Sequence, residues 1–170
     1  MMGPSAFGIQ MGQKLDQLDV LEAEGSGRYK IMPPEPYPGF ESYKVDVAPN
    51  SGVFWLMAIG NNHEDDGSGE SVRVAYRKLQ RILETKYGQY EMSDTVPGNT
   101  RPREWVMAIC NGSEFGSQWH EEYGSSLPEG LNSIVLTIGA FEASTSYVII
   151  HYCFSNSSIG QKEIDLASPL

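Results

Sequence analysis

The chain has 170 residues, of which 40% are hydrophobic and 20% are charged, and its formal net charge is -10. This length and apolar content exclude a disordered chain and predict a single globular domain, residues 1–170. The shortage of lysine and arginine disfavours nonspecific nucleic-acid binding, because phosphate recognition needs excess positive charge. Eighteen glycines and ten prolines argue against an all-helical fold.

The first predicted elements are a strand in residues 6–11 and a short helix in residues 14–21. Apolar residues alternate in the first segment, and leucines recur at helical spacing in the second. A turn at residues 25–27 and a brief apolar run at residues 29–32 follow. Four prolines between residues 33 and 38 then predict an extended loop, because proline removes a backbone donor.

The middle of the chain predicts a hairpin followed by one long helix. Residues 43–47 alternate between apolar and polar, which is the period of a half-buried strand, and residues 53–59 are continuously apolar. From Glu70 to Tyr87 the apolar residues fall on a single helical face. Ser68 is the predicted N-cap, and Gly88 supplies the left-handed end of the helix.

The last third predicts more strands and long connections. Residues 89–103 are expected to be a long loop, residues 105–110 a strand, and residues 119–123 a short helical turn within a polar segment. Two final strands, residues 134–138 and 147–154, form a hairpin, and the tail beyond residue 156 shows no periodicity. The order of elements predicts an α+β domain, with an antiparallel sheet of about five to seven strands and one main helix packed on one face.

The N-terminus and the cysteines indicate the compartment. Residues 1–12 lack a basic start followed by an apolar run, and no segment approaches the roughly 18 apolar residues of a membrane span. We therefore expect a soluble, cytoplasmic protein. Cys110 and Cys153 lie in apolar runs, where buried free thiols are expected, with a disulfide between neighbouring strands as the alternative.

Two short motifs carry a resemblance to other proteins. Phe7-Gly8-Ile9, followed by Gly12, opens the chain, and Lys86-Tyr87-Gly88 closes the main helix. In these motifs the chain resembles a loose group of small, uncharacterised bacterial α+β proteins that are prophage-linked or envelope-associated. The resemblance implies a fold and carries over no catalytic residue.

Two acidic segments are candidate partner-binding sites. The first comprises Glu64, Asp65 and Asp66 and lies in a glycine-flanked loop before the helix. Its carboxylates do not have the alternating spacing of a calcium loop, so a solvated loop is the simpler interpretation. The second segment, at residues 119–123, combines two carboxylates with aromatic side chains. Its candidate binding residues are Trp119, Glu121, Glu122 and Tyr123.

Three histidines leave an enzymatic alternative open. His120 can act as an acid or a base near neutral pH, and His63 and His151 could join it if the fold brought them together. Such a cluster would make a small metal-dependent hydrolase with a zinc site. We find no nucleophile elbow and no phosphate-binding loop, and the sequence predicts no cofactor.

The charge is unevenly distributed along the chain. The helix from Glu70 to Tyr87 carries five basic and two acidic side chains, a balance of +3, which leaves -13 for the remainder. An acidic surface would attract a partner protein with a basic surface. The leading hypothesis is therefore a non-enzymatic inhibitor or immunity-type protein that neutralises a nuclease-like toxin or a defence protein. An envelope-associated structural module is a third possibility.

Overall fold

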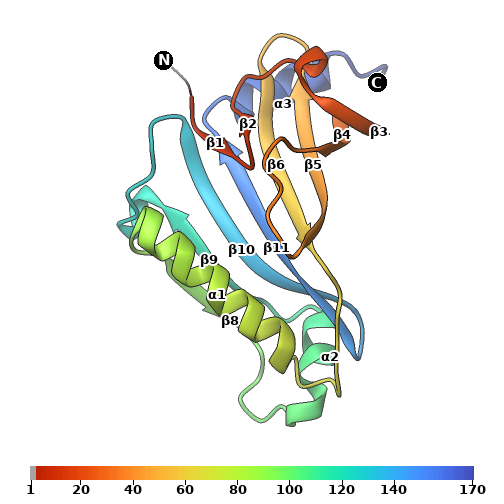
Figure 1. Cartoon of the computed structure of the whole chain (residues 1–170), viewed down its shortest axis with the longest axis vertical. Coiled ribbons are helices and arrows are strands. Elements are labelled where there is room, and N and C mark those ends of the chain that lie inside the picture. Colours follow the sequence, from red (N-terminus) through yellow and green to blue (C-terminus); the bar gives the residue numbers. More distant parts are fainter. Residues whose placement is uncertain (1–2) are drawn as a thin grey trace. The chain divides into compact units, whose positions relative to one another are not determined.

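The structure is a computed structural model that describes residues 3–170 and has an α+β architecture with a large antiparallel sheet (Figure 1). The predicted class is confirmed, but the sheet has nine strands instead of five to seven. Strand β7 (His63–Glu64) pairs with β11, outside the main path. The other eight strands follow the order β3 (Asp19–Gly25), β4 (Arg28–Met32), β5 (Phe40–Ala48), β6 (Gly52–Gly60), β11 (Thr145–Phe154), β10 (Leu131–Glu142), β9 (Phe115–His120) and β8 (Glu91–Asp94).

Contacts within the chain divide it into two compact units. Unit 1 comprises residues 1–58, 127–133 and 151–170, and unit 2 comprises residues 59–126 and 134–150. Each unit has its own helices. Unit 1 contains α3 (Ser157–Leu166) and the 3₁₀ turn η1 (Leu15–Gln17), and unit 2 contains α1 (Glu70–Tyr87), α2 (Trp105–Cys110) and the 3₁₀ turns η2 (Pro102–Glu104) and η3 (Glu121–Tyr123).

The N-terminal segment differs from the prediction. The expected single strand is a small hairpin of β1 (Ser5–Ala6) and β2 (Ile9–Gln10), which pair with each other in a separate two-stranded sheet. Phe7 and Gly8 form its turn with φ angles of 54° and 78°, so the chain reverses where alternation alone predicted a straight strand. The expected helix is only the single turn η1.

Strand β3 forms an edge of the large sheet in unit 1. All seven of its residues are exposed, and it pairs with β4 alone. The register between the two strands shifts after Val20 and again after Ala23. Such irregularities increase the local twist and are common at sheet edges.

The predicted hairpin of residues 43–59 is confirmed as β5 and β6, and α3 packs against it in unit 1. The sequence analysis missed this helix. Its ten residues include only three large apolar side chains, Ile159, Ile164 and Leu166, and Gly160 interrupts the segment. The glycine is needed for packing, because a Cβ atom there would lie 2.3 Å from a ring carbon of Phe54.

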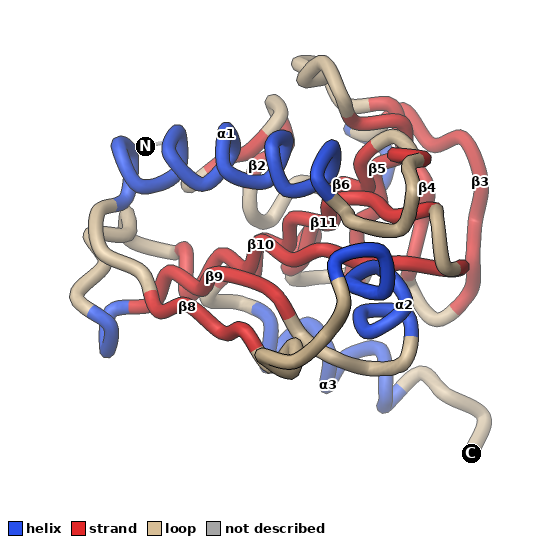
Figure 2. The backbone as a smooth tube through the Cα atoms, turned by 90° about the horizontal axis from the view of Figure 1, so that it is seen from below, coloured by secondary structure: helices blue, strands red, loops and turns tan. Residues whose placement is uncertain are grey.

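The long helix α1 has the predicted bounds, and it lies along β8 and β9 in unit 2 (Figure 2). Its buried face carries Val72, Tyr76 and Leu83. The N-cap is Gly69 instead of Ser68. Gly69 has a φ of 68°, and a Cβ atom there would lie 2.4 Å from the Trp105 ring, so both backbone and space favour glycine.

The segment after α1 contains two further differences. Residues 89–103 are not one long loop, since they contain β8 and η2. Residues 105–110 form the short helix α2 where a strand was expected. A short apolar run fits either element, and here Trp105, Val106 and Ile109 are buried on one helical face. Arg73 of α1 lies over the Trp105 ring at 4.4 Å and links the two helices.

The final hairpin is confirmed as β10 and β11. Both cysteines are free thiols: Cys110 is exposed at the end of α2, so the prediction of its burial is wrong, and Cys153 is half-buried in β11. Among residues 3–170, no helix combines the length and apolar content needed to cross a membrane.

Candidate functional site

The loop before α1 uses acidic side chains to hold its own conformation. Asp65 and Asp66 each accept a hydrogen bond from the backbone N–H two residues later, at 2.9 and 3.1 Å. Hydrogen bonds from the hydroxyl and backbone of Ser68 hold the pKa of Asp66 below its usual value, and Arg103 lies 3.6 Å away. Asp65 and Asp66 therefore shape the loop, whereas Glu64 is exposed at the end of β7.

The second predicted segment spans the end of β9 and the turn η3. Trp119 is fully buried, and its indole N–H donates to the carbonyl oxygen of Gly88 at 3.1 Å. Trp119 is therefore not available as an exposed anchor, because its ring is part of the core and its polar atom is paired. Glu121 and Glu122 are exposed and Tyr123 is half-buried, so these three residues remain candidates.

Tyr123 lies in a negatively charged environment. A hydrogen bond with the Glu122 side chain, together with the nearby charge of Glu91, raises the pKa of its phenol. The His120 ring lies 6.0 Å from that of Tyr123, and its Nδ1 accepts the backbone N–H of Glu122 at 3.2 Å. His120 thus caps η3 and holds the two acidic residues in place.

The two predicted acidic segments lie at opposite ends of α1. The first immediately precedes the helix, and the second is anchored through Trp119 to Gly88, which immediately follows it. Eighteen helical residues at about 1.5 Å each separate the ends by about 27 Å. The predicted residues therefore form two acidic surfaces instead of one.

Strands β8 and β9 add acidic and polar groups beside the second surface. Glu91 lies opposite Gln118 in the ladder between these strands, so their side chains share one face of the sheet. Ser117 points to the other face, where it forms a hydrogen bond with Tyr76 of α1. Glu91 and Gln118 consequently lie on the face that α1 does not cover.

A groove of about 460 Å³ lies on that face of unit 2. We call it the acidic groove. No lysine or arginine belongs to the described residues that line it, and both carboxylates in its lining are exposed. Its polar and aromatic lining includes Glu91, Ser93, Glu114, Gln118, Tyr123 and Tyr147.

Two glycines of the groove lining lie in neighbouring strands where adjacent atoms leave no room for a side chain. A Cβ atom on Gly116 of β9 would lie 2.8 Å from the carbonyl oxygen of Leu136. One on Gly139 of β10 would lie 2.9 Å from the Tyr147 ring, so this ring packs closely over the glycine. Phe141 lies beside that ring, at 5.9 Å between centroids, and is 58% exposed. The groove thus has acidic groups and an exposed aromatic border.

Each histidine has a local partner. The Nδ1 of His63 forms a 2.7 Å hydrogen bond with the Ser71 hydroxyl, and His120 caps η3. His151, in unit 1, packs on the Trp55 ring at 5.3 Å, and burial lowers its pKa, with a smaller contribution from the charge of Arg28. Within residues 3–170, no three His, Cys, Asp or Glu side chains gather in a group that could hold a metal ion.

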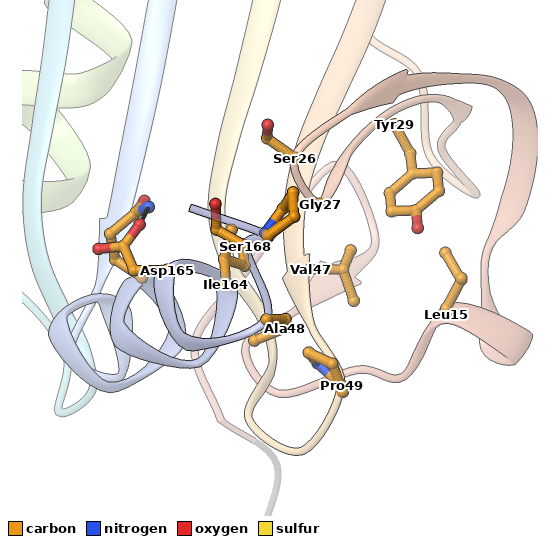
Figure 3. A pocket seen from close by; sticks show the side chains of 13 residues that line it. Leu15, Ser26, Gly27, Tyr29, Val47, Ala48, Pro49, Ile164, Asp165 and Ser168 are labelled. Carbon is orange, nitrogen blue, oxygen red and sulfur yellow. Dashed lines mark hydrogen bonds between the residues drawn. The ribbon is translucent and has the colours of Figure 1, made fainter.

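Unit 1 contains a second hollow, of about 690 Å³, beside the end of α3 (Figure 3). Leu15 and Tyr29 lie on one side of it, and Ile164, Asp165 and Ser168 of the C-terminal segment lie on the other. Among the described residues that line it, Asp165 is the one carboxylate, whereas the acidic groove has two. The acidic groove therefore matches the charge of the predicted partner better.

Of the six groove residues named above, only Tyr123 was a candidate from the sequence, and five were missed: Glu91, Ser93, Glu114, Gln118 and Tyr147. Glu91 and Ser93 alternate with Met92, which is a weak strand signal inside the segment interpreted as a loop. Glu114 immediately precedes β9, and Tyr147 was assigned to a strand without regard to its face. These residues come together in the groove because their strands pair with one another. The spacing of residues within one strand does not show which strands pair.

Together, the fold and the groove define an acidic α+β protein with an open, negatively charged sheet face in unit 2. Comparison of the chain with protein-family models, with curated proteins and with solved structures gave no match.

Proposed function

We propose that this chain is a non-enzymatic protein that binds a partner protein through the partner's basic surface. An inhibitor or immunity-type protein that neutralises a nuclease-like toxin or a defence protein fits this chemistry best. The observation that carries the proposal is the acidic groove with its neighbours Glu121 and Glu122, which are exposed beside Tyr123.

The charge of unit 2 supports this proposal. Outside α1, the unit has ten acidic side chains and two basic ones, Arg101 and Arg103, which gives a net charge of -8. A surface of one sign attracts an oppositely charged protein over a distance and raises its association rate by about 10- to 1,000-fold. It also covers the groups with which a nuclease would hold phosphate.

The aromatic residues support the proposal in a second way, because they could hold a partner protein once charge has attracted it. Tyr123 and Tyr147 line the groove, and Phe141 is exposed beside it. Tyrosine is enriched among the residues that dominate the energy of protein interfaces, because its ring is large and rigid and carries a polar end. The acidic side chains would guide the partner, and the aromatic rings would hold it.

The experiment that tests the proposal uses charge reversal. The Glu121→Lys/Glu122→Lys variant changes the acidic surface beside the groove. The matched control, Glu35→Lys/Glu41→Lys, changes net charge by the same amount at exposed positions of unit 1. Each tagged chain is used to capture proteins from cells that encode it, and a captured protein is then purified for kinetic measurements.

We expect wild type and control to capture the same basic protein, and the Glu121/Glu122 variant to lose it. The association rate with the purified partner should fall as salt rises, because salt screens exposed charges. Equal capture by all three chains, or a salt-independent association rate, would contradict the proposal.

A further inference from the structure

We infer that the acidic groove binds one arginine side chain of the partner protein. The inference rests on the proposed function and names the group that the groove recognises. It follows from three observations: the charge of the lining, the aromatic rings in it, and the acceptor groups that belong to it.

The charge of the groove is not neutralised from within the chain. Among the ion pairs formed by residues 3–170, none involves Glu91 or Glu114. The Glu114 carboxylate accepts one long hydrogen bond, 3.5 Å from the Ser93 hydroxyl to its Oε2. A cation that enters the groove therefore finds two carboxylates without competing positive charges.

The volume of the groove accommodates a long side chain. Its volume of about 460 Å³ lies within the usual range for ligand sites of about 300 to 1,000 Å³. The Tyr147 ring covers Gly139, and Thr137 lies against Gly116, so both glycines form part of the floor of the groove. A methylene stem can lie along the apolar part of the lining, which includes Val135 and Ala140, with its charged end at a carboxylate.

The lining favours a guanidinium over an ammonium group. Guanidinium is planar, stacks on aromatic faces and presents five donors in a fixed arrangement. Tyr123 and Tyr147 provide rings, and Glu91, Glu114 and the side-chain oxygen of Gln118 provide acceptors. A lysine ammonium would satisfy the charge of the groove but would not stack on its rings.

The test uses small probes and the full chain, so it does not depend on knowing the partner. Nα-acetyl-L-arginine methylamide is titrated into the ¹⁵N-labelled chain, and backbone amide signals are followed by NMR. The citrulline analogue has nearly the same shape as the arginine probe but no charge. The lysine analogue has the charge but no planar guanidinium group. We expect saturable shifts at Gly116, Gly139 and their neighbours with the arginine probe, and weaker binding of the other two.

Two variants locate the binding. Removal of both groove carboxylates in Glu91→Gln/Glu114→Gln should weaken the arginine probe about tenfold, since each exposed ion pair contributes up to about 1 kcal/mol. The control Glu35→Gln/Glu41→Gln removes the same charge from unit 1 and should leave affinity unchanged. Tyr147→Leu should weaken the arginine probe more than the lysine probe, and a well-dispersed spectrum shows that each variant is folded.

Shifts confined to residues outside the groove would overturn the inference. So would equal binding of the arginine and citrulline probes, equal binding of the arginine and lysine probes, or equal losses in the two glutamine variants. These results leave the proposed function intact if charge reversal at Glu121 and Glu122 still abolishes capture of the partner. Loss of the proposed function, in contrast, is measured by the capture experiment alone.

Discussion

Tyr76 of α1 and Ser117 of β9 share a hydrogen bond in the buried space between helix and sheet, where their exposed fractions are 1% and 2%. The side-chain amide of Gln80, one helical turn after Tyr76, donates to the same serine hydroxyl at 2.7 Å. The pair fixes α1 against one face of β9 and so leaves the opposite face free for the acidic groove.

Substitution of the serine should cost more stability than removal of the tyrosine hydroxyl. In Ser117→Ala the buried phenol keeps only a 3.6 Å contact with the sulfur of Met92, whereas in Tyr76→Phe the serine keeps Gln80. We expect losses of about 1–3 kcal/mol and about 0.5–1.5 kcal/mol, respectively. Urea unfolding measures both, with the exposed Ser126→Ala as control. The reverse order would show that the phenol has another partner.

Alkaline pH should destabilise the fold through Tyr76. Burial raises the pKa of its phenol to about 12, above the ordinary value of 10, and the hydrogen bond with Ser117 opposes this only in part. Because the folded pKa is the higher one, the stabilisation is complete below pH 10 and declines as pH rises towards 12. Unfolding experiments between pH 9 and 12 should show a steeper decline for wild type than for Tyr76→Phe. Identical curves would contradict the assignment.

Glu163 should make α3 sensitive to acid. Its carboxylate accepts a hydrogen bond from the Ser51 hydroxyl and one from the Asn50 backbone N–H at 2.9 Å, and these bonds hold its pKa below the ordinary 4.5. The resulting stabilisation is present above pH 4.5 and is lost as pH falls through the lower folded pKa. Glu163→Gln should lower the melting temperature at pH 7 and reduce its further fall in acid. The exposed Glu129→Gln provides the control, and an unchanged acid profile in Glu163→Gln would refute the expectation.

Two glycine-to-alanine substitutions should have different effects. In α3, Gly160→Ala forces a methyl group against the Phe54 ring, and overpacking of this kind costs about 1–3 kcal/mol, which exceeds the gain in helix propensity of about 1 kcal/mol. Gly98→Ala places its methyl group in open space, with no atom within 4 Å. Thermal unfolding should show a lower midpoint for Gly160→Ala and little change for Gly98→Ala. Equal midpoints would mean that α3 can shift away from Phe54 at little cost.

Trp119 and Tyr123 should have separable roles. Trp119→Ala removes a fully buried indole and should cost about 3–5 kcal/mol of stability. Tyr123→Ala, on the surface turn η3, should cost less than about 1 kcal/mol and should weaken partner binding. Urea unfolding and the capture experiment together distinguish the two residues. A strong loss of stability in Tyr123→Ala would assign that ring to the core instead of the binding surface.

Long periodic segments could be predicted from the sequence, and short ones could not. The face of α1 was clear because apolar residues recur over five turns, and the β5–β6 hairpin was clear from alternation and a turn. The run of residues 105–110 spans less than two helical turns, so its apolar residues fit either a strand or a helix. Segment α3 was missed because its packing depends on the absence of a side chain at Gly160.

The candidate site shows the same limit. Tyr123 was identified because charge and aromatic residues adjoin it in the sequence, but Trp119, in the same segment, points into the core. Side chains alternate between the two faces of β9, and this alternation places Trp119 on the buried face. It could be recognised only once Phe115–His120 was known to be a strand. Glu91 and Glu114 reach the groove through strand pairing, which a single segment does not encode.

Some of the chain's acidic residues lie on the exposed edge strand β3, where they have a role that does not involve a partner protein. Unpaired edge strands recruit other strands and so promote aggregation, unless charge or irregularity prevents it. Here Asp19 and Glu22 repel a second copy, whereas Glu24 is paired with Lys44, and the two register shifts keep the edge from being flat. As pH falls towards the isoelectric point near 4.7, this repulsion weakens while the edge stays open. Purification and storage well above that pH keep the copies apart.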